Sequence, residues 1–130
     1  MCVYFNKKIG TTLRWNKVGE TVAGITSQLG TQPNQLSIPF DVAINYANTL
    51  YISDMNNNRI QRWFRGASSG TTVCGLQNGT HGSAANQLYS PGIVALDSDD
   101  GIYIADSQNS RIQFCTSNAT NALTVAGNGM

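Results

Sequence analysis

The chain repeats itself, and this repetition constrains its fold more than any other feature of the sequence. When the sequence is shifted by 52 residues, the segment from Asn34 to Gln61 aligns with the segment from Asn86 to Gln113, and 13 of the 28 positions are identical. The pattern Thr-Val-x-Gly also recurs, beginning at Thr21, Thr72 and Thr124. Self-similarity at such a period predicts an array of like supersecondary units.

Each unit divides into four short strand candidates separated by turn signals. In the first unit they are residues 40–45, 49–54, 59–64 and 71–75, and in the second they are residues 92–97, 101–106, 111–116 and 123–127. The segments between them are rich in Asn, Asp and Ser, which suit the backbone angles of tight turns. Strands of five or six residues joined by short turns favour an antiparallel meander.

Both faces of these strands carry apolar or small residues near their middle. Val42 and Ile44 point to one side of the first strand while Ala43 points to the other, and Leu50 opposes Tyr51 in the second strand. A sheet with one face in water would alternate cleanly with polar residues. Two buried faces favour a blade packed between neighbouring blades, as in a β-propeller.

The two units resemble the NHL repeat, whose pattern is a Pro before an apolar strand, an apolar strand ending in Asp, and then Asn-x-Arg-Ile. The matching residues are Pro39, Asp54 and Asn57 to Ile60 in the first unit and Pro91, Asp106 and Asn109 to Ile112 in the second. The resemblance implies an all-β fold of four-stranded antiparallel meander blades of a β-propeller, here about two and a half of them. We expect a partial N-terminal blade of outer strands with its connecting loop in residues 1–33, and NHL-type blades in residues 34–76 and 77–130.

Ring closure needs about four or more blades, so a chain of about two and a half blades leaves three arrangements open. The chain is a fragment of a longer protein, or several chains assemble, or the array stays open with exposed strand edges. We favour the fragment. Three chains that supply two blades each are geometrically attractive, provided that the rotation between them closes.

Composition and charge exclude several partner classes. The formal net charge of +1 gives no global drive toward nucleic acid or an anionic membrane, and no apolar run approaches the roughly 18 residues of a membrane span. Charge is unevenly placed, because residues 1–65 hold seven Lys or Arg and three Asp or Glu, whereas residues 66–130 hold one and four. The first residues lack the apolar run of a signal peptide. Two Asn-x-Ser/Thr acceptors, at Asn78 and Asn118, matter only if the chain is secreted, so the compartment is left open.

The three cysteines, Cys2, Cys74 and Cys115, show neither the paired spacing of a disulfide framework nor that of a zinc site. Cys74 stands where the other two Thr-Val-x-Gly segments carry Ala, which favours a small packed residue. A disulfide between Cys74 and Cys115 is the alternative.

Two acid–base pairs recur in register, Asp54 with Arg59 and Asp106 with Arg111. Each Asp ends a strand and each Arg begins the next, so the carboxylate can accept turn N–H groups and face the guanidinium. An acidic ligand for a metal or substrate is one interpretation. Recurrence in both units favours a structural clamp that every blade needs.

A second group of residues is a candidate ligand surface: Asp41, Arg62, Trp63 and Arg65. Arg and aromatic side chains together can bind single-stranded RNA through phosphates and base stacking. Strand alternation would divide these cations between two faces, which favours a solvated edge instead. Asp41 stands where the second unit has Ile93, and a polar residue unique to one first strand is either a ligand contact in a central channel or a turn contact.

We predict no catalytic, cofactor-binding or metal-binding residue in this stretch. His81 is the only histidine, and three carboxylates near residue 99 form a polar hairpin turn rather than the spacing of a calcium loop. The resemblance implies either an interaction platform or an enzyme akin to the peptide-amidating lyase. We expect a non-catalytic scaffold that binds protein. The alternatives are single-stranded RNA binding and a fragment of a propeller enzyme whose active site lies outside this chain.

Overall fold

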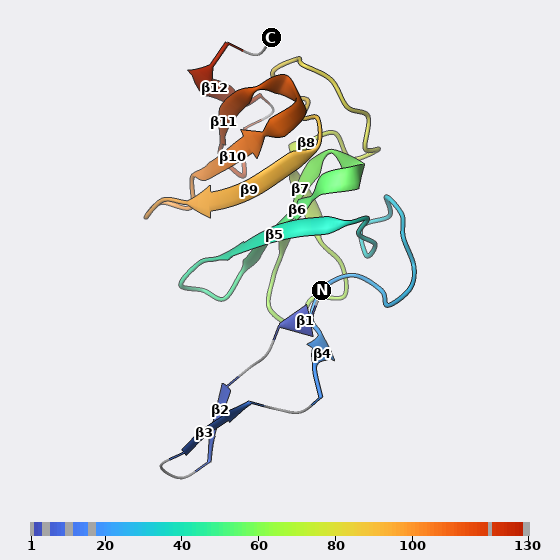
Figure 1. Cartoon of the computed structure of the whole chain (residues 1–130), viewed down its shortest axis with the longest axis vertical. Helices are drawn as coiled ribbons and strands as arrows, with labels where there is room; N and C mark the ends of the chain where they lie inside the picture. Colours follow the sequence, from blue (N-terminus) through green and yellow to red (C-terminus); the bar gives the residue numbers. More distant parts are fainter. Residues whose placement is uncertain (1, 4–5, 10–11, 16–17, 120, 129–130) are drawn as a thin grey trace.

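The computed structural model describes residues 2–3, 6–9, 12–15, 18–119 and 121–128. Two four-stranded antiparallel sheets dominate it, which we call the first blade (β5-β6-β7-β8) and the second blade (β9-β10-β11-β12) (Figure 1). In each blade, strands that are neighbours in the sequence are neighbours in the sheet. The fold is therefore the predicted all-β arrangement of meander blades of a β-propeller.

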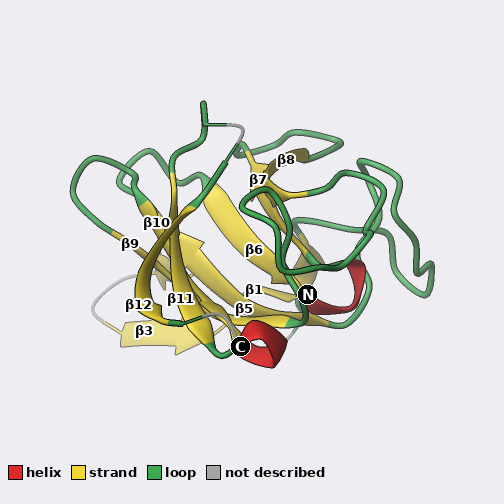
Figure 2. Cartoon of the chain, turned by 90° about the horizontal axis from the view of Figure 1, so that it is seen from above, coloured by secondary structure: helices red, strands yellow, loops and turns green. Residues whose placement is uncertain are grey.

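The strands of the first blade are β5 (Pro39–Ile44), β6 (Leu50–Asp54), β7 (Arg59–Trp63) and β8 (Thr71–Gly75). Those of the second blade are β9 (Pro91–Leu96), β10 (Ile102–Asp106), β11 (Arg111–Cys115) and β12 (Leu123–Gly127). A short 3-10 turn joins the second and third strands of each blade, η1 (Met55–Asn57) and η2 (Ser107–Asn109), and these are the helical segments seen in Figure 2. Every predicted strand agrees with the observed one to within one residue at each end.

Turn chemistry places these boundaries. The backbone enters the left-handed region at the ends of the tight turns, with φ of 58° at Asn48 and 62° at Asp100. The turns after β6 and β10 do the same at Asn58 and Ser110, both with φ of 51°. Asn and Asp tolerate this region better than most residues.

The glycine that closes Thr-Val-x-Gly is required by a close approach of two strands. Gly75 and Gly127 have φ of 83° and 80°. A Cβ at Gly75 would collide with the Asn58 carbonyl oxygen, and one at Gly127 with that of Ser110. Only glycine accepts both the backbone angle and the contact.

The two blades stack face to face, and their contact forms the main core (Figure 1). Tyr51, Ile60 and Val73 of the first blade share this inter-blade cluster with Ile102 and Ile104 of the second. A second cluster covers the opposite face of the first blade. It consists of Ala23, Leu36, Leu50, Ile52 and Trp63, with Val22, Val42 and Ala67 packed against it. The first blade is thus covered on both faces, whereas the second is covered on one.

The N-terminal strands form two separate pairs that extend away from the blades (Figure 1). Strand β1 (Cys2–Val3) pairs with β4 (Glu20–Thr21), and β2 (Asn6–Ile9) pairs with β3 (Thr12–Trp15). The assignment of residues 1–33 to a partial blade stays a prediction. In the part of the chain that the structure describes, no helix has the length and apolarity to cross a bilayer.

Candidate functional site

Asp54 and Arg59 form a buried ion pair across the turn between β6 and β7. Arg59 Nε lies 2.8 Å from Asp54 Oδ2, and both side chains have no exposed surface. The other carboxylate oxygen, Oδ1, accepts the Ser37 N–H at 2.7 Å. Asn57 also donates to Oδ2 from its side chain, at 2.9 Å. Both oxygens of the carboxylate are therefore occupied by groups of the protein itself.

The remaining donors of Arg59 hold the loop that enters the first blade. Nη1 donates to Thr31 O at 2.7 Å and to Gln77 O at 2.9 Å. Nη2 donates to Gln35 O at 3.1 Å and to Gln32 O at 3.3 Å. One guanidinium thus joins the turn, the incoming loop and the outgoing loop.

The second blade repeats this arrangement with Asp106 and Arg111. Arg111 Nε lies 2.8 Å from Asp106 Oδ2, and Asp106 Oδ1 accepts the Tyr89 N–H at 2.7 Å. Nη1 donates to Ser83 O at 2.8 Å, and Nη2 to Gln87 O at 3.0 Å. The partners occupy the same places one unit later, and this geometry suits the structural interpretation of the pairs.

Asp41 contacts the neighbouring blade. Its Oδ2 accepts the Val94 N–H at 2.9 Å, so this half-buried carboxylate links β5 to β9. Ser53 Oγ donates to Pro91 O at 2.6 Å across the same interface. Neither proposed role of Asp41, a ligand contact or a turn contact, describes this bond between blades.

A disulfide joins the two blades, from the edge strand of the first to the third strand of the second. Cys74 of β8 is bonded to Cys115 of β11, and their Cα atoms are 6.4 Å apart. The interpretation of Cys74 as only a small packed residue is therefore wrong, and the alternative holds. One unit earlier the corresponding residues are Ala23 and Trp63, which belong to the same apolar cluster. The Trp63 indole and the Ala23 methyl group therefore stand at the positions that the disulfide occupies between the blades.

Arg62, Trp63 and Arg65 do not form one surface with Asp41. Trp63 is 2% exposed, and its indole Nε1 donates to Ala67 O at 2.9 Å. Arg62 is half-buried, with its guanidinium carbon 5.0 Å from the centre of the Phe64 ring. Arg65 is exposed and lies beyond the end of β7. The cations are therefore separated, as strand alternation predicts.

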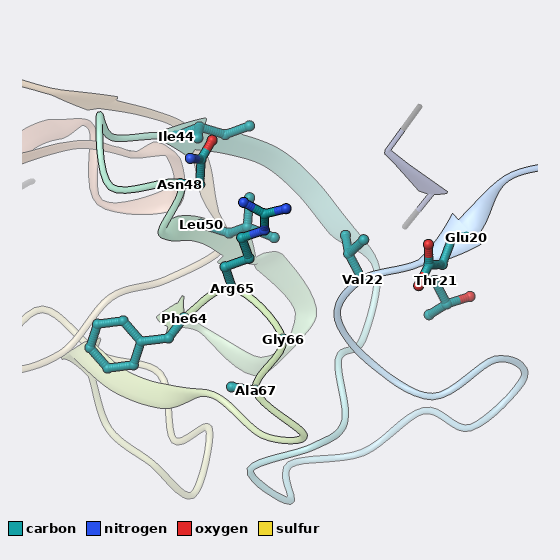
Figure 3. A pocket seen from close by; sticks show the side chains of 10 residues that line it. All are labelled: Glu20, Thr21, Val22, Ile44, Asn48, Leu50, Phe64, Arg65, Gly66 and Ala67. Atoms are coloured by element: carbon teal, nitrogen blue, oxygen red, sulfur yellow. The ribbon is translucent and has the colours of Figure 1, made fainter. Parts of the chain in front are cut away.

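A pocket of about 560 Å³ opens beside the first blade, next to the second cluster (Figure 3). Arg65 reaches over Leu50 on one wall, and Val22, Thr21 and Glu20 stand opposite (Figure 3). The other lining residues are Ile44, Asn48, Phe64, Gly66 and Ala67. Apart from Arg65, none of these residues was assigned to a site from the sequence. The repeat nevertheless pairs Ile44 with the half-buried Leu96 and Leu50 with the buried Ile102.

The uncovered face of the second blade is apolar. Ile93 of β9 is 63% exposed, Tyr103 of β10 is 39% exposed and Val125 of β12 is 46% exposed. The Tyr103 ring lies 4.9 Å from that of Phe114 on the next strand. We call this surface, made of Ile93, Ala95, Tyr103, Ile112, Phe114 and Val125, the open face.

The surroundings of Tyr51 shift its pKa. Burial, together with the Asp100 carboxylate, raises the pKa of Tyr51, while Arg62 lowers it. His81 stacks on Tyr89, with ring centres 4.3 Å apart. Within the described residues, no three His, Cys, Asp or Glu side chains are grouped so as to hold a metal ion.

Comparison with known proteins gives one family. The model described as NHL repeat matches residues 88–113, which run from the loop before β9 into β11. No curated protein matches the chain. The matched segment contains the Asp106–Arg111 pair and the whole of β9 and β10, two of the strands on which the open face is built. The chain therefore contains an NHL repeat at residues 88–113, and this repeat lies in its second blade.

Proposed function

We propose that this chain is a non-catalytic scaffold segment that binds protein through the open face of the second blade. One observation carries the proposal. The corresponding face of the first blade is covered by another blade, whereas the open face is exposed to solvent. Tyr51 is 3% exposed, and its counterpart Tyr103 is 39% exposed. Contiguous exposed apolar surface of this kind marks interaction sites.

The apolar character of the open face supports the choice of an apolar protein surface as its partner. Polar groups that bridge the blades have apolar counterparts on it, since Ile93 replaces Asp41 and Ala105 replaces Ser53. Phe114 likewise replaces Arg62. A partner would bury side chains here without having to satisfy these polar groups.

The contacts in the described residues do not favour RNA as the partner. Arg59 is buried in its ion pair and Arg62 is half-buried against Phe64, which leaves Arg65 as the exposed cation of the predicted patch. The enzyme alternative places its active site outside this chain, so it depends on residues other than these.

Site-specific photo-crosslinking tests the proposal. Benzoylphenylalanine at position 103 should give a discrete crosslinked polypeptide in the native host, identified by mass spectrometry. The same group at position 46 is the matched control, because Tyr46 is a fully exposed tyrosine outside the open face. Absence of a product at 103, or the same products at both positions, would contradict the proposal.

A further inference from the structure

We propose that Asn78 is a modification site, the acceptor of an N-linked glycan. The sequence contains the segment Asn78-Gly79-Thr80, and Asn-x-Ser/Thr with x other than Pro is the acceptor motif for this modification. The motif acts only in a chain that enters the secretory pathway, and only where the asparagine is accessible. The structure bears on both conditions, and the proposed site is independent of the open face.

The disulfide between Cys74 and Cys115 points to the compartment. Cys74 is 4% exposed and Cys115 is 3% exposed, and both belong to the inter-blade cluster, so the bond is part of the packed core. Disulfides form and persist in oxidising environments such as the lumen of the endoplasmic reticulum, and they are rare in the cytosol. N-linked glycans are attached in the same lumen. A chain that forms its disulfide there therefore also meets the enzyme that would modify Asn78.

Entry into that lumen requires a targeting segment. The first residues of this chain lack the apolar run of a signal peptide. A longer protein would have to supply the segment, and the number of blades favours such a protein because two and a half blades do not close a ring.

Asn78 lies at the surface, in the loop that follows β8. Both Asn78 and Thr80 are exposed, and Gly79 between them is half-buried. Asn78 Oδ1 accepts the Thr80 N–H at 3.1 Å, which forms an Asx turn. Among the described residues, none forms a hydrogen bond with Asn78 Nδ2. The atom to which a glycan is attached is therefore exposed and not used by the fold.

The backbone on both sides of Asn78 is anchored to the first blade. Gln77 O accepts a hydrogen bond from Arg59 Nη1 at 2.9 Å. Gly79 O accepts one from Asn58 Nδ2 at 3.0 Å. These bonds hold the loop without the Asn78 amide nitrogen, so a glycan on Nδ2 would displace no hydrogen bond of the fold.

The chemistry is a glycosyl transfer to an amide nitrogen. Asn78 Nδ2 bonds to the anomeric carbon of the first sugar, the bond from that carbon to the diphosphate of a lipid-linked oligosaccharide breaks, and one proton leaves the nitrogen. The lipid diphosphate is the leaving group, and a transferase of the host catalyses the step. The product keeps the side-chain carbonyl, so Oδ1 still accepts the Thr80 N–H. The observed loop is thus compatible with the modified side chain.

The glycan would stand beside the first blade. The loop around Asn78 is bonded to Asn58 and Arg59, at the turn between β6 and β7. The open face lies on strands of the second blade and includes no residue of this loop. We therefore expect the bulky, solubilising glycan to leave crosslinking at position 103 unchanged.

Peptide N-glycosidase treatment of the protein from its native host tests the proposal. The enzyme converts a glycan-carrying asparagine into aspartate, and in water enriched in heavy oxygen it labels that residue for mass spectrometry. Asn78 should be labelled in most copies. A parallel sample without the enzyme is the control, because an Asn-Gly pair is prone to spontaneous deamidation in the same water. Each acceptor is read separately, so a label at Asn118 does not count.

Variants at the motif, expressed in the native host, separate a glycan from other changes at Asn78. Thr80→Ala should abolish the modification although Asn78 is retained, whereas Thr80→Ser should keep it. Asn78→Asp loses the acceptor nitrogen but keeps the oxygen that accepts the Thr80 N–H, so the modification should disappear while the free energy of unfolding stays the same. An Asn78 without enzyme-dependent label in every copy would overturn the proposal, and so would a modification that survives in Thr80→Ala.

Discussion

Arg59 and Asp54 are two fully buried charges, and each depends on the other and on the loop around them. A buried ion pair contributes little net stability when compared with apolar residues, but removing one partner leaves an uncompensated charge. The guanidinium also satisfies four loop carbonyls, which would lose their donors. Arg59 is therefore far more important for the stability of the first blade than an exposed Arg would be.

Arg59→Met should lower the free energy of unfolding by about 3–5 kcal/mol, as measured by urea denaturation. Arg65→Met is the matched control, because it removes an exposed Arg six residues away and should change stability by about 0.5 kcal/mol or less. Similar losses in the two variants would mean that the buried pair has no special role.

Tyr51 predicts a pH dependence of stability. Burial and Asp100 raise its pKa in the folded chain, so the folded state holds the phenolic proton more tightly than the unfolded state. This contribution is fully present below the unfolded pKa, near pH 10, and is lost as pH rises through the folded pKa. The free energy of unfolding should therefore fall more steeply above about pH 10 in the wild type than in Tyr51→Phe. Equal slopes in the two chains would contradict this expectation.

At the scale of the elements, the contact between the blades is tied by one covalent bond. The disulfide joins β8 to β11 and closes a segment whose ends are 41 residues apart. Closing such a loop restricts the unfolded chain, so the bond stabilises the folded one. The first blade achieves the equivalent contact with Trp63 and Ala23, and thus without a cross-link.

Reducing the disulfide should lower the free energy of unfolding by about 2–4 kcal/mol. The measurement is urea denaturation with and without a thiol reductant. The variant with both Cys74→Ala and Cys115→Ala should be less stable than the oxidised wild type. Its free energy of unfolding should be the same with and without the reductant. A wild-type chain that is indifferent to the reductant would show that the bond contributes nothing to stability.

At the scale of the whole molecule, local patterns determined much of the fold before the structure was known. The strands were predictable because their alternation and the turn residues between them are local signals, as at Asn48 and Asp100. The stacking of the blades, in contrast, depends on contacts between residues that are far apart in the sequence. The bond from Asp41 to Val94 spans 53 residues, and the disulfide spans 41, so neither has a signature in the neighbouring sequence.

The pocket and the open face escaped prediction for a related reason. Each is defined by what does not cover it, and sequence alone does not show which blade faces remain bare. The repeat nevertheless contained a usable signal. Pairing each residue with its counterpart 52 positions away matches Ile44 with Leu96 and Tyr103 with Tyr51, and in both pairs the first residue is the more exposed one.

The two buried arginines also bear on how such an array can grow or shrink. Each one bonds to the loop that precedes its own blade, from Thr31 in the first unit and from Ser83 in the second. A gene rearrangement that duplicated only the four strands of a blade would leave a copied Arg without its loop carbonyls. The tolerated step in evolution is therefore a whole repeat of 52 residues, in which every blade keeps the loop that precedes it.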